Sequence, residues 1–148
     1  MAFAWFAFFE AAGEAGALAD ADRARLCELL AHAPGLLRAH LFTPAAARTP
    51  FDGDGEPPRL ALQADFGDLA SLEAALAANG AFAVLAAPHA WPSLAGTSVR
   101  HQAMWSRSFP VPAPPAPTAT AACSFLVHYP GAPADLNAWL RYYLAHHP

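Results

Sequence analysis

The residues best suited to chemistry gather near the end of the chain. The stretch HYPGAPADLNAWLRYYLAHHP holds an aromatic side chain at Trp139, the pair Tyr142 and Tyr143, and the adjacent histidines His146 and His147. An imidazole titrates near neutral pH, so it can accept a proton from a bound molecule or donate one to it. A tyrosine hydroxyl can donate a hydrogen bond to a carbonyl or phenol oxygen. We therefore predict a catalytic site around His147 and Tyr143, with Tyr142 and Trp139 binding the substrate.

Helix geometry distinguishes the two histidines. A helix beginning at about Pro133 has an apolar stripe formed by Leu136, Trp139, Leu140 and Tyr143. His147 follows Leu136 by roughly three full turns and lies on this stripe, whereas His146 is rotated from it by about 100°. We therefore expect the stripe to be buried and His147 to point inward.

Polar side chains on the expected strands form a second candidate site. They alternate with apolar residues, so each set occupies one face of its strand, where it could line a pocket or a barrel. These residues are Arg38 and His40, then Gln63, His101 and His128. No pair of histidines has the spacing of a metal site on one helix, and no motif indicates an organic cofactor. We expect neither.

Composition excludes several classes of function. The net charge is −4 and the chain has no lysine, which excludes a P-loop and a Schiff-base lysine. The arginines are scattered, which argues against binding to nucleic acid. No apolar run is long enough to span a membrane. The cysteines Cys27 and Cys123 are far apart and are expected to be small buried apolar residues, so a reduced cytoplasmic protein is the default expectation.

The elements that must position these residues follow from periodicity. Strands are predicted over 2–12, 36–43, 59–66 and 97–109, with one helix after Asp20 or Asp22 and another capped by Asp68. The order strand-helix-strand-strand-helix-strand is the α+β, ferredoxin-like βαββαβ arrangement. Residues 81–96 give no clear pattern beyond a short helical turn, and His89 and Trp91 within them are expected at the surface.

The faces of these elements are also predicted. In the first strand Phe3, Trp5 and Phe9 share one face and Phe6 and Phe8 the other, so both faces require cover. The expected inward residues elsewhere are Leu26, Leu29 and Leu30 in the first helix, Leu37, Ala39 and Leu41 in the second strand, and Leu69, Leu72 and Leu76 in the second helix.

A second unit is predicted after residue 109. Residues 110–118 carry five prolines and are expected to form an extended linker. A strand over 120–129 and a helix follow, and LRYYLAHHP (140–148) matches LCELLAHAP (26–34) at five of nine positions. This indicates an internal repeat of which 119–148 is the beginning. We expect either a fragment of a longer protein or a strand-helix pair that packs on the first unit or on another chain.

The stretch from His128 to Pro148 resembles the EthD family of the dimeric α/β-barrel superfamily, in which a strand ending in a Tyr-Pro-like turn precedes a helix with an aromatic residue, a Tyr-Tyr pair and His-x-Pro. Here Trp139, Tyr142 and Tyr143 match, and the motif histidine is His147, or His146 if His146-His147-Pro148 is read as His-x-Pro. The resemblance implies a tandem version of the barrel and a loose assignment to oxidoreductases.

Two functions are consistent with these patterns. The first is an EthD-like oxidoreductase, similar to cofactor-free monooxygenases, that acts on a small aromatic or apolar organic compound. The second is a non-catalytic barrel module for association or small-ligand binding. In both, a homodimer or the second repeat is expected to cover the sheet face.

The inward position of His147 gives a test. In a longer parent protein, His147→Ala is expected to lower turnover or ligand affinity with little loss of stability, because a buried imidazole oriented toward a ligand contributes mainly to the site. His146→Ala should change neither. Ligand binding and thermal unfolding of both variants check this, and equal binding by the wild type and His147→Ala would remove His147 from the site.

Overall fold

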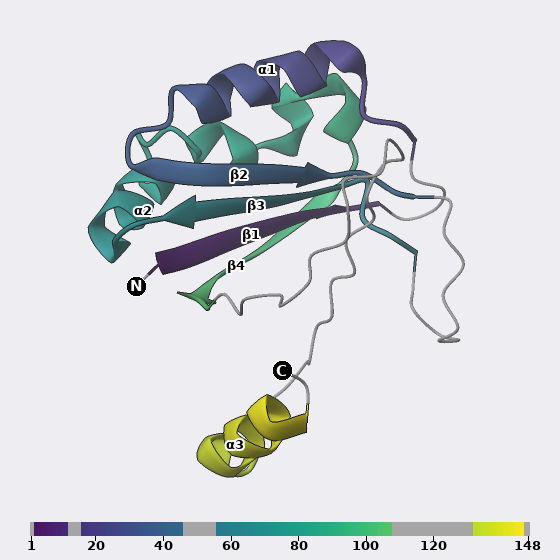
Figure 1. The fold of residues 1–148 in the computed structure, drawn as a ribbon. Coiled ribbons are helices and arrows are strands. Elements are labelled where there is room, and N and C mark those ends of the chain that lie inside the picture. The colour runs from purple at the N-terminus through teal and green to yellow at the C-terminus, as the bar shows by residue number, and fades with distance from the viewer. Residues whose placement is uncertain (1, 12–15, 46–55, 108–131, 147–148) are drawn as a thin grey trace, which may run out of the picture. The chain divides into compact units, whose positions relative to one another are not determined.

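A computed structural model describes residues 2–11, 16–45, 56–107 and 132–146. The chain divides into two units, Met1–Arg107 and Ser108–Pro148, and each is described by itself. The first unit follows the order β1 (Ala2–Glu10), α1 (Asp20–Ala31), β2 (Leu36–Phe42), β3 (Leu60–Phe66), α2 (Leu69–Leu76) and β4 (Ser98–Ser106) (Figure 1). The predicted order of strands and helices is confirmed.

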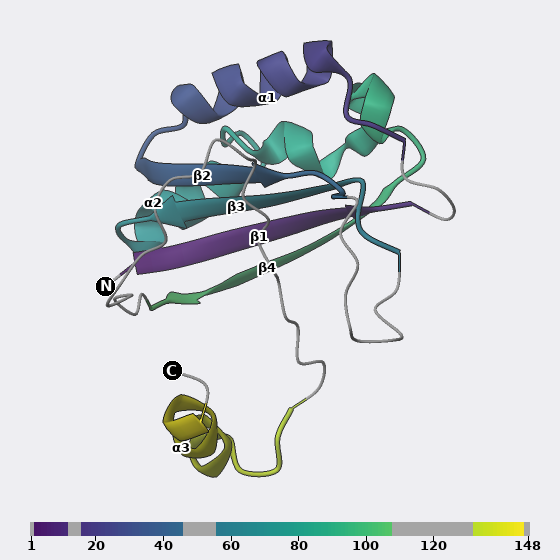
Figure 2. The same ribbon diagram turned by 45° about the vertical axis from the view of Figure 1, so that its right-hand side comes forward.

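The four strands form one sheet in the order β2-β3-β1-β4, and each pair of neighbours is antiparallel. This is the strand order of the ferredoxin-like fold. Both helices and the segment between α2 and β4 lie on one face of the sheet (Figures 1 and 2). The central strands β1 and β3 therefore have one face under helices, and we call the opposite side the second face.

The core lies between this sheet and its helices. Trp5 and Phe9 of β1, Leu62 and Phe66 of β3 and Leu26 of α1 are all buried there. The predicted division of β1 is confirmed, because Phe3 packs against the same core whereas Phe6 and Phe8 lie on the opposite face. Burying one aromatic side chain stabilises a fold by about 1.5–3 kcal/mol, so this face of β1 contributes strongly.

The β2 strand departs from its predicted pattern. The register pairs Leu36 with Phe66 but Arg38 with Asp65, so one residue, Leu37, is extra on the β2 side. This bulge turns Leu37 outward, where it is 68% exposed, and the core receives Leu36, Ala39 and Leu41 instead. The expectation that Leu37 faces the core was wrong because strict alternation does not foresee an added residue.

The start of α1 also differs from the prediction. Neither Asp20 nor Asp22 caps the helix, whose N-cap is Ala19. Asp22 is instead buried and accepts a 2.7 Å hydrogen bond from the backbone N–H of Ser93, and another from its hydroxyl. This carboxylate joins α1 to a segment about seventy residues later in the chain.

That segment, between α2 and β4, consists of three 3-10 turns, Ala83–Ala86, Pro88–Ala90 and Pro92–Leu94. Trp91 is fully buried, donates from its indole Nε1–H to the carbonyl of Val84 at 3.1 Å, and lies 4.2 Å below the Arg25 guanidinium. The surface position expected for Trp91 was wrong, whereas His89 is exposed. Hydrogen bonding of the indole allows this large side chain to be buried.

Two further expectations about the helices are corrected. Leu69 lies in the first turn of α2 and is 47% exposed, while Leu72 and Ala75 fill the core. Cys27 is exposed on α1 because Leu26 takes the inward position beside it. Cys123 lies outside the described residues.

The second unit contains the helix α3 (Leu136–His146), capped by Asp135, whose carboxylate accepts a 2.9 Å bond from the Ala138 N–H. The helix is confirmed, but its stripe is not buried within the described residues: Leu136 is 56% exposed and Leu140 39%. The expected linker 110–118 and strand 120–129 lie outside the described residues, and the repeat stays a prediction. In the described part of the chain, no helix is long and apolar enough to cross a membrane.

The N-terminus of α2 provides a stability test. As predicted, Asp68 caps this helix by accepting hydrogen bonds from the Ser71 N–H at 2.8 Å and the Ser71 hydroxyl at 3.0 Å. The bond from the Ser71 backbone N–H has the larger effect and the bond from its hydroxyl the next, and both lower the pKa of the Asp68 carboxyl from its ordinary 3.8. Because the carboxyl has a lower pKa in the folded state than in the unfolded state, its ionised form stabilises the fold at pH values above the unfolded-state pKa. This contribution is lost as the pH falls through the folded-state pKa.

We expect Asp68→Ala to unfold at lower urea concentration than the wild type at pH 7, with a difference that shrinks in acid below pH 3.8. Asp68→Asn is the matched control, because asparagine caps a helix without a charge and should lose the pH-dependent part only. Urea unfolding at pH 7 and pH 3 measures both. If the stability difference between the wild type and Asp68→Ala were the same at both pH values, the lowered pKa assigned to Asp68 would be contradicted.

Candidate functional site on the second face of the sheet

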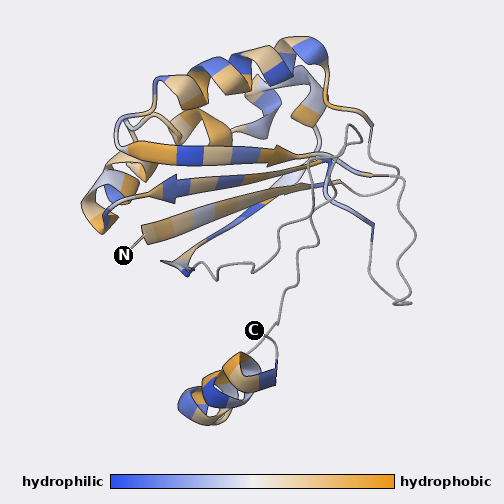
Figure 3. Cartoon of the chain, in the orientation of Figure 1, coloured by the Kyte–Doolittle hydropathy of each residue, from blue (hydrophilic) through white to orange (hydrophobic). Residues whose placement is uncertain are grey.

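The second face presents cross-strand rows of polar and aromatic side chains. The register sets His40, Gln63, Phe6 and Gln102 opposite one another across the four strands. Neighbouring rows hold Arg38, Asp65, Ala4 and Met104 on one side, and Phe42, Ala61, Phe8 and Arg100 on the other. Figure 3 shows hydrophilic stretches in β2 and β3 beside a mostly hydrophobic β1.

Asp65 is the centre of the polar group. Its side chain is 6% exposed, and one carboxylate oxygen accepts bonds from Arg38 Nε at 2.9 Å and Nη2 at 2.7 Å. The other oxygen accepts from Gln63 Nε2 at 3.0 Å. A buried carboxylate needs such partners, because an unpaired charge away from water is costly. Asp65 thus holds both Arg38 and Gln63 in place on this face.

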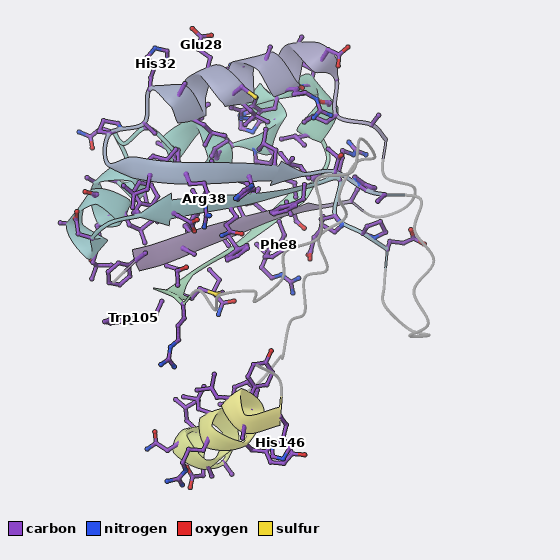
Figure 4. All side chains as sticks on the ribbon, viewed as in Figure 1. Phe8, Glu28, His32, Arg38, Trp105 and His146 are labelled. Carbon is purple, nitrogen blue, oxygen red and sulfur yellow. The ribbon has the colours of Figure 1, made fainter. Side chains whose placement is uncertain are left out.

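Arg38 is anchored on one side and accessible on the other. Its side chain is 58% exposed although two of its nitrogens bond to Asp65, and Figure 4 shows it in front of β2 and β3. A guanidinium carries five N–H donors in a planar fork. Its remaining donors can therefore meet an oxygen atom of a bound molecule.

Aromatic rings surround this polar group. Phe6 and Phe8 lie nearly parallel with ring centroids 6.2 Å apart, and His40 stacks on Phe42 at 5.9 Å. Arg100 lies 5.7 Å from the Phe8 ring centroid and pairs with Glu10 at 2.6 Å. Flat rings beside fixed donors suit a planar organic molecule with a polar substituent.

The structure separates the predicted site residues into groups. Arg38, His40 and Gln63 share the second face, as alternation indicated. His101 does not join them: it pairs with Ala7 of the core, and its ring lies 6.0 Å from that of Trp5, on the helix side of β4. The expectation that His101 lines the same lumen is wrong, because residues 101 and 102 face opposite sides of the strand.

The α3 residues lie in the second unit. There Trp139 stacks on Tyr143 at 5.1 Å, and Tyr142 on His146 at 4.1 Å. His146 Nδ1 lies 2.8 Å from the carbonyl oxygen of Tyr142, which ties it to its own helix. His147 and His128 lie outside the described residues, so their catalytic and binding roles stay predictions.

Sequence reasoning did not single out Asp65. Its signal was an acidic residue within an otherwise apolar strand, ALQADF, one position from the inward Phe66. Asp65 and Gln63 are two residues apart and thus share a face, and Arg38 on the neighbouring strand supplies the charge. Within the described ranges, no group of three or more metal-binding side chains comes together.

Several solved structures have a similar fold. A point mutant of SnoaB, a cofactor-independent oxygenase from Streptomyces nogalater, is 19% identical with a TM-score of 0.48, over 73% of this chain and 95% of that one. A dimeric ferredoxin-like protein of unknown function from Jannaschia sp. CCS1 is 17% identical with a TM-score of 0.49, over 72% and 100%. An ethyl tert-butyl ether D (EthD) family protein from Bacillus halodurans C-125 is 16% identical with a TM-score of 0.47, over 72% and 100%.

These identities bear on the fold and not on the activity of this chain. A scan against protein-family models finds no match, and a search of curated proteins finds none either.

The pairing of the buried Asp65 carboxylate with Arg38 can be tested by its contribution to stability. Among the described residues, removing Arg38 leaves Asp65 with Gln63 as its side-chain partner, so Arg38→Ala is expected to lower the free energy of unfolding by about 1–3 kcal/mol. Adding Asp65→Asn should recover part of this loss, because the charge that needed pairing is gone.

Arg100→Ala is the control, since its pair with Glu10 is exposed on both sides and exposed pairs contribute at most about 1 kcal/mol. Chemical unfolding of these three variants and the wild type forms the comparison. Equal losses of unfolding free energy in Arg38→Ala and Arg100→Ala would show that the Arg38–Asp65 pair contributes no more to stability than an exposed ion pair.

Proposed function

We propose that this chain is an oxidoreductase of the EthD type, similar to cofactor-free monooxygenases, that binds a small aromatic organic compound on the second face of its sheet. The observation that carries the proposal is the Arg38–Asp65–Gln63 group set beside the rings of Phe6 and Phe8. The resemblance of the α3 stretch to the EthD family supports the reaction class.

The chemistry of the face favours a substrate with an acidic oxygen. A phenol or enol ring would stack over Phe6, and its oxygen would accept a hydrogen bond from an outward N–H of Arg38. His40, exposed in the next row, is near enough in the sheet register to exchange a proton with that oxygen. A guanidinium next to the oxygen favours its anionic form.

The reaction proposed is a monooxygenation in which the substrate itself is the reductant. In an enol substrate, whose keto form carries a CH₂ group, one atom of O₂ becomes a carbonyl oxygen on that carbon, and the other leaves as water with the two hydrogens of the carbon. Arg38 would stabilise the anion that forms when the first proton leaves. In the second unit, the roles proposed for His147 and Tyr143 are those of an acid-base group and an orienting group.

The second face needs a cover for this chemistry, because an aromatic floor open to water binds weakly. We propose a second copy of the chain, in a homodimer, or the second repeat as that cover. The half-buried Phe6 of β1 and the exposed side chains of Arg38 and His40 would lie under it, and water excluded by the cover would strengthen the Arg38 interaction.

A binding or association module without catalysis is the alternative. It is favoured by the Asp65 carboxylate, whose two oxygens both accept hydrogen bonds from neighbouring side chains and so hold the face together. In this case the face would retain a ligand or a partner without turning over.

The test is a titration with 1-naphthol, a fluorescent phenol, combined with an oxygen electrode and a panel of phenols and anthrones. We expect saturable naphthol binding that weakens about fivefold or more in His40→Ala and Arg38→Ala, since each removes a polar contact worth about 1 kcal/mol or more. Arg141→Ala on α3 removes the same charge elsewhere and should bind normally.

Oxygen uptake with any compound of the panel that binds would establish the oxidoreductase. Binding without oxygen uptake would favour the binding module, and wild-type affinity in both His40→Ala and Arg38→Ala would move the site away from the second face. Sedimentation of the wild type at several concentrations measures whether a second copy provides the cover.

A further inference from the structure

A groove runs along the margin of the sheet, beside α1, and shares Arg38 with the second face. It has a volume of about 630 Å³ and lies between α1 and β2, which are neighbours in both ribbon views (Figures 1 and 2). One wall is the α1 face made of Arg23, Cys27, Leu30 and Ala31. The other wall is β2 from Leu36 to Leu41.

The β2 wall is the edge of the sheet. The strand order places β3 on one side of β2, and no strand in the described residues pairs with its other side. An edge strand presents unpaired backbone N–H and C=O groups, which can be completed by an added strand. The exposed Leu37 at the bulge adds apolar surface beside this edge.

The spacing of side chains along the α1 wall matches the spacing of side chains on one face of an added strand. Arg23, Cys27 and Ala31 are four residues apart, so they recur every 6 Å or so along α1. Side chains on one face of a strand recur about every 6.6 Å. A strand lying along β2 would therefore set one side chain against each successive turn of the helix.

The chemistry of the groove selects the side chains of that strand. Arg23 is exposed, and its guanidinium has no hydrogen bond or ion pair with any described residue. Because the connection from α1 to β2 is a short turn, the helix and strand run in opposite directions, and Arg23 lies at the Leu41 end. From there toward Leu30 and Leu36 the lining is apolar except for Arg38, whose guanidinium is already bound to Asp65.

From these observations we propose that the groove binds an extended peptide by strand addition to β2. Its first inward side chain is acidic and pairs with Arg23, and the next two inward side chains are small and apolar, against Cys27 and then Leu30 and Ala31. The backbone bonds of the edge supply affinity, and the alternate side chains supply specificity.

The probe is a fluorescein-labelled, end-capped peptide of sequence ETVTVT, in which the first, third and fifth side chains face the helix. We expect saturable binding in an anisotropy titration and slower hydrogen exchange of the β2 backbone amides. Arg23→Glu is expected to weaken binding about tenfold or more, because it replaces attraction by repulsion. The peptide KTVTVT should bind Arg23→Glu better than it binds the wild type.

Two further variants keep the test independent of folding. Arg141→Glu on α3 makes the same charge change away from the groove and should leave binding unchanged. Cys27→Trp fills the groove from an exposed position, so it should abolish binding while the thermal unfolding temperature stays near that of the wild type.

The proposal is overturned by absence of saturable binding at millimolar peptide, or by binding that Arg23→Glu and Cys27→Trp leave unchanged. It is also overturned if the wild type forms a dimer that Cys27→Trp dissociates, since the groove would then hold a second copy. Both groove variants leave Arg38 intact, and naphthol binding is measured separately on them, so failure of this proposal is distinguished from failure of the second-face site.

Discussion

The buried face of β1 is the constraint on which the first unit depends. Trp5 and Phe9 point toward the helices and can leave water only if α1, α2 and the turns before β4 lie over them. Because β1 is central, pairing with β3 on one side and β4 on the other, a one-residue shift of its register would move these rings to the opposite face. The sheet, the helices and the second face are therefore fixed together.

A few polar contacts then hold the cover in place. Asp22 of α1 binds the backbone N–H of Ser93, and Arg25 lies over the buried ring of Trp91. These contacts come from one helix turn and reach a segment distant in sequence, so they close a long loop over the core. Arg59 adds a bond of 2.9 Å to the Ser93 carbonyl from the start of β3. The segment between α2 and β4 is ordered by its partners more than by its own periodicity.

The two proposed binding regions use different properties of the same sheet. The second face offers side chains, with Asp65 holding Arg38 and Gln63 among aromatic rings. The groove offers the backbone edge of β2 together with one wall of α1. Arg38 follows the bulged residue Leu37, so the same irregularity sets the position of the guanidinium and exposes a leucine beside the edge.

Periodicity alone determined the order of the elements, the two faces of β1 and the cap of α2, because each depends on neighbours within a few residues in the chain. Arg38 and His40 were placed on one face for the same reason. The sequence could not show the bulge at Leu37, the burial of Trp91 or the pairing of Asp65 with Arg38. Those features depend on contacts between residues far apart in the chain, and the energies that decide them arise only when the strands are side by side. The pairing of Asp22 with Ser93 shows this directly, since local pattern made Asp22 a candidate helix cap and the folded core made it a buried link.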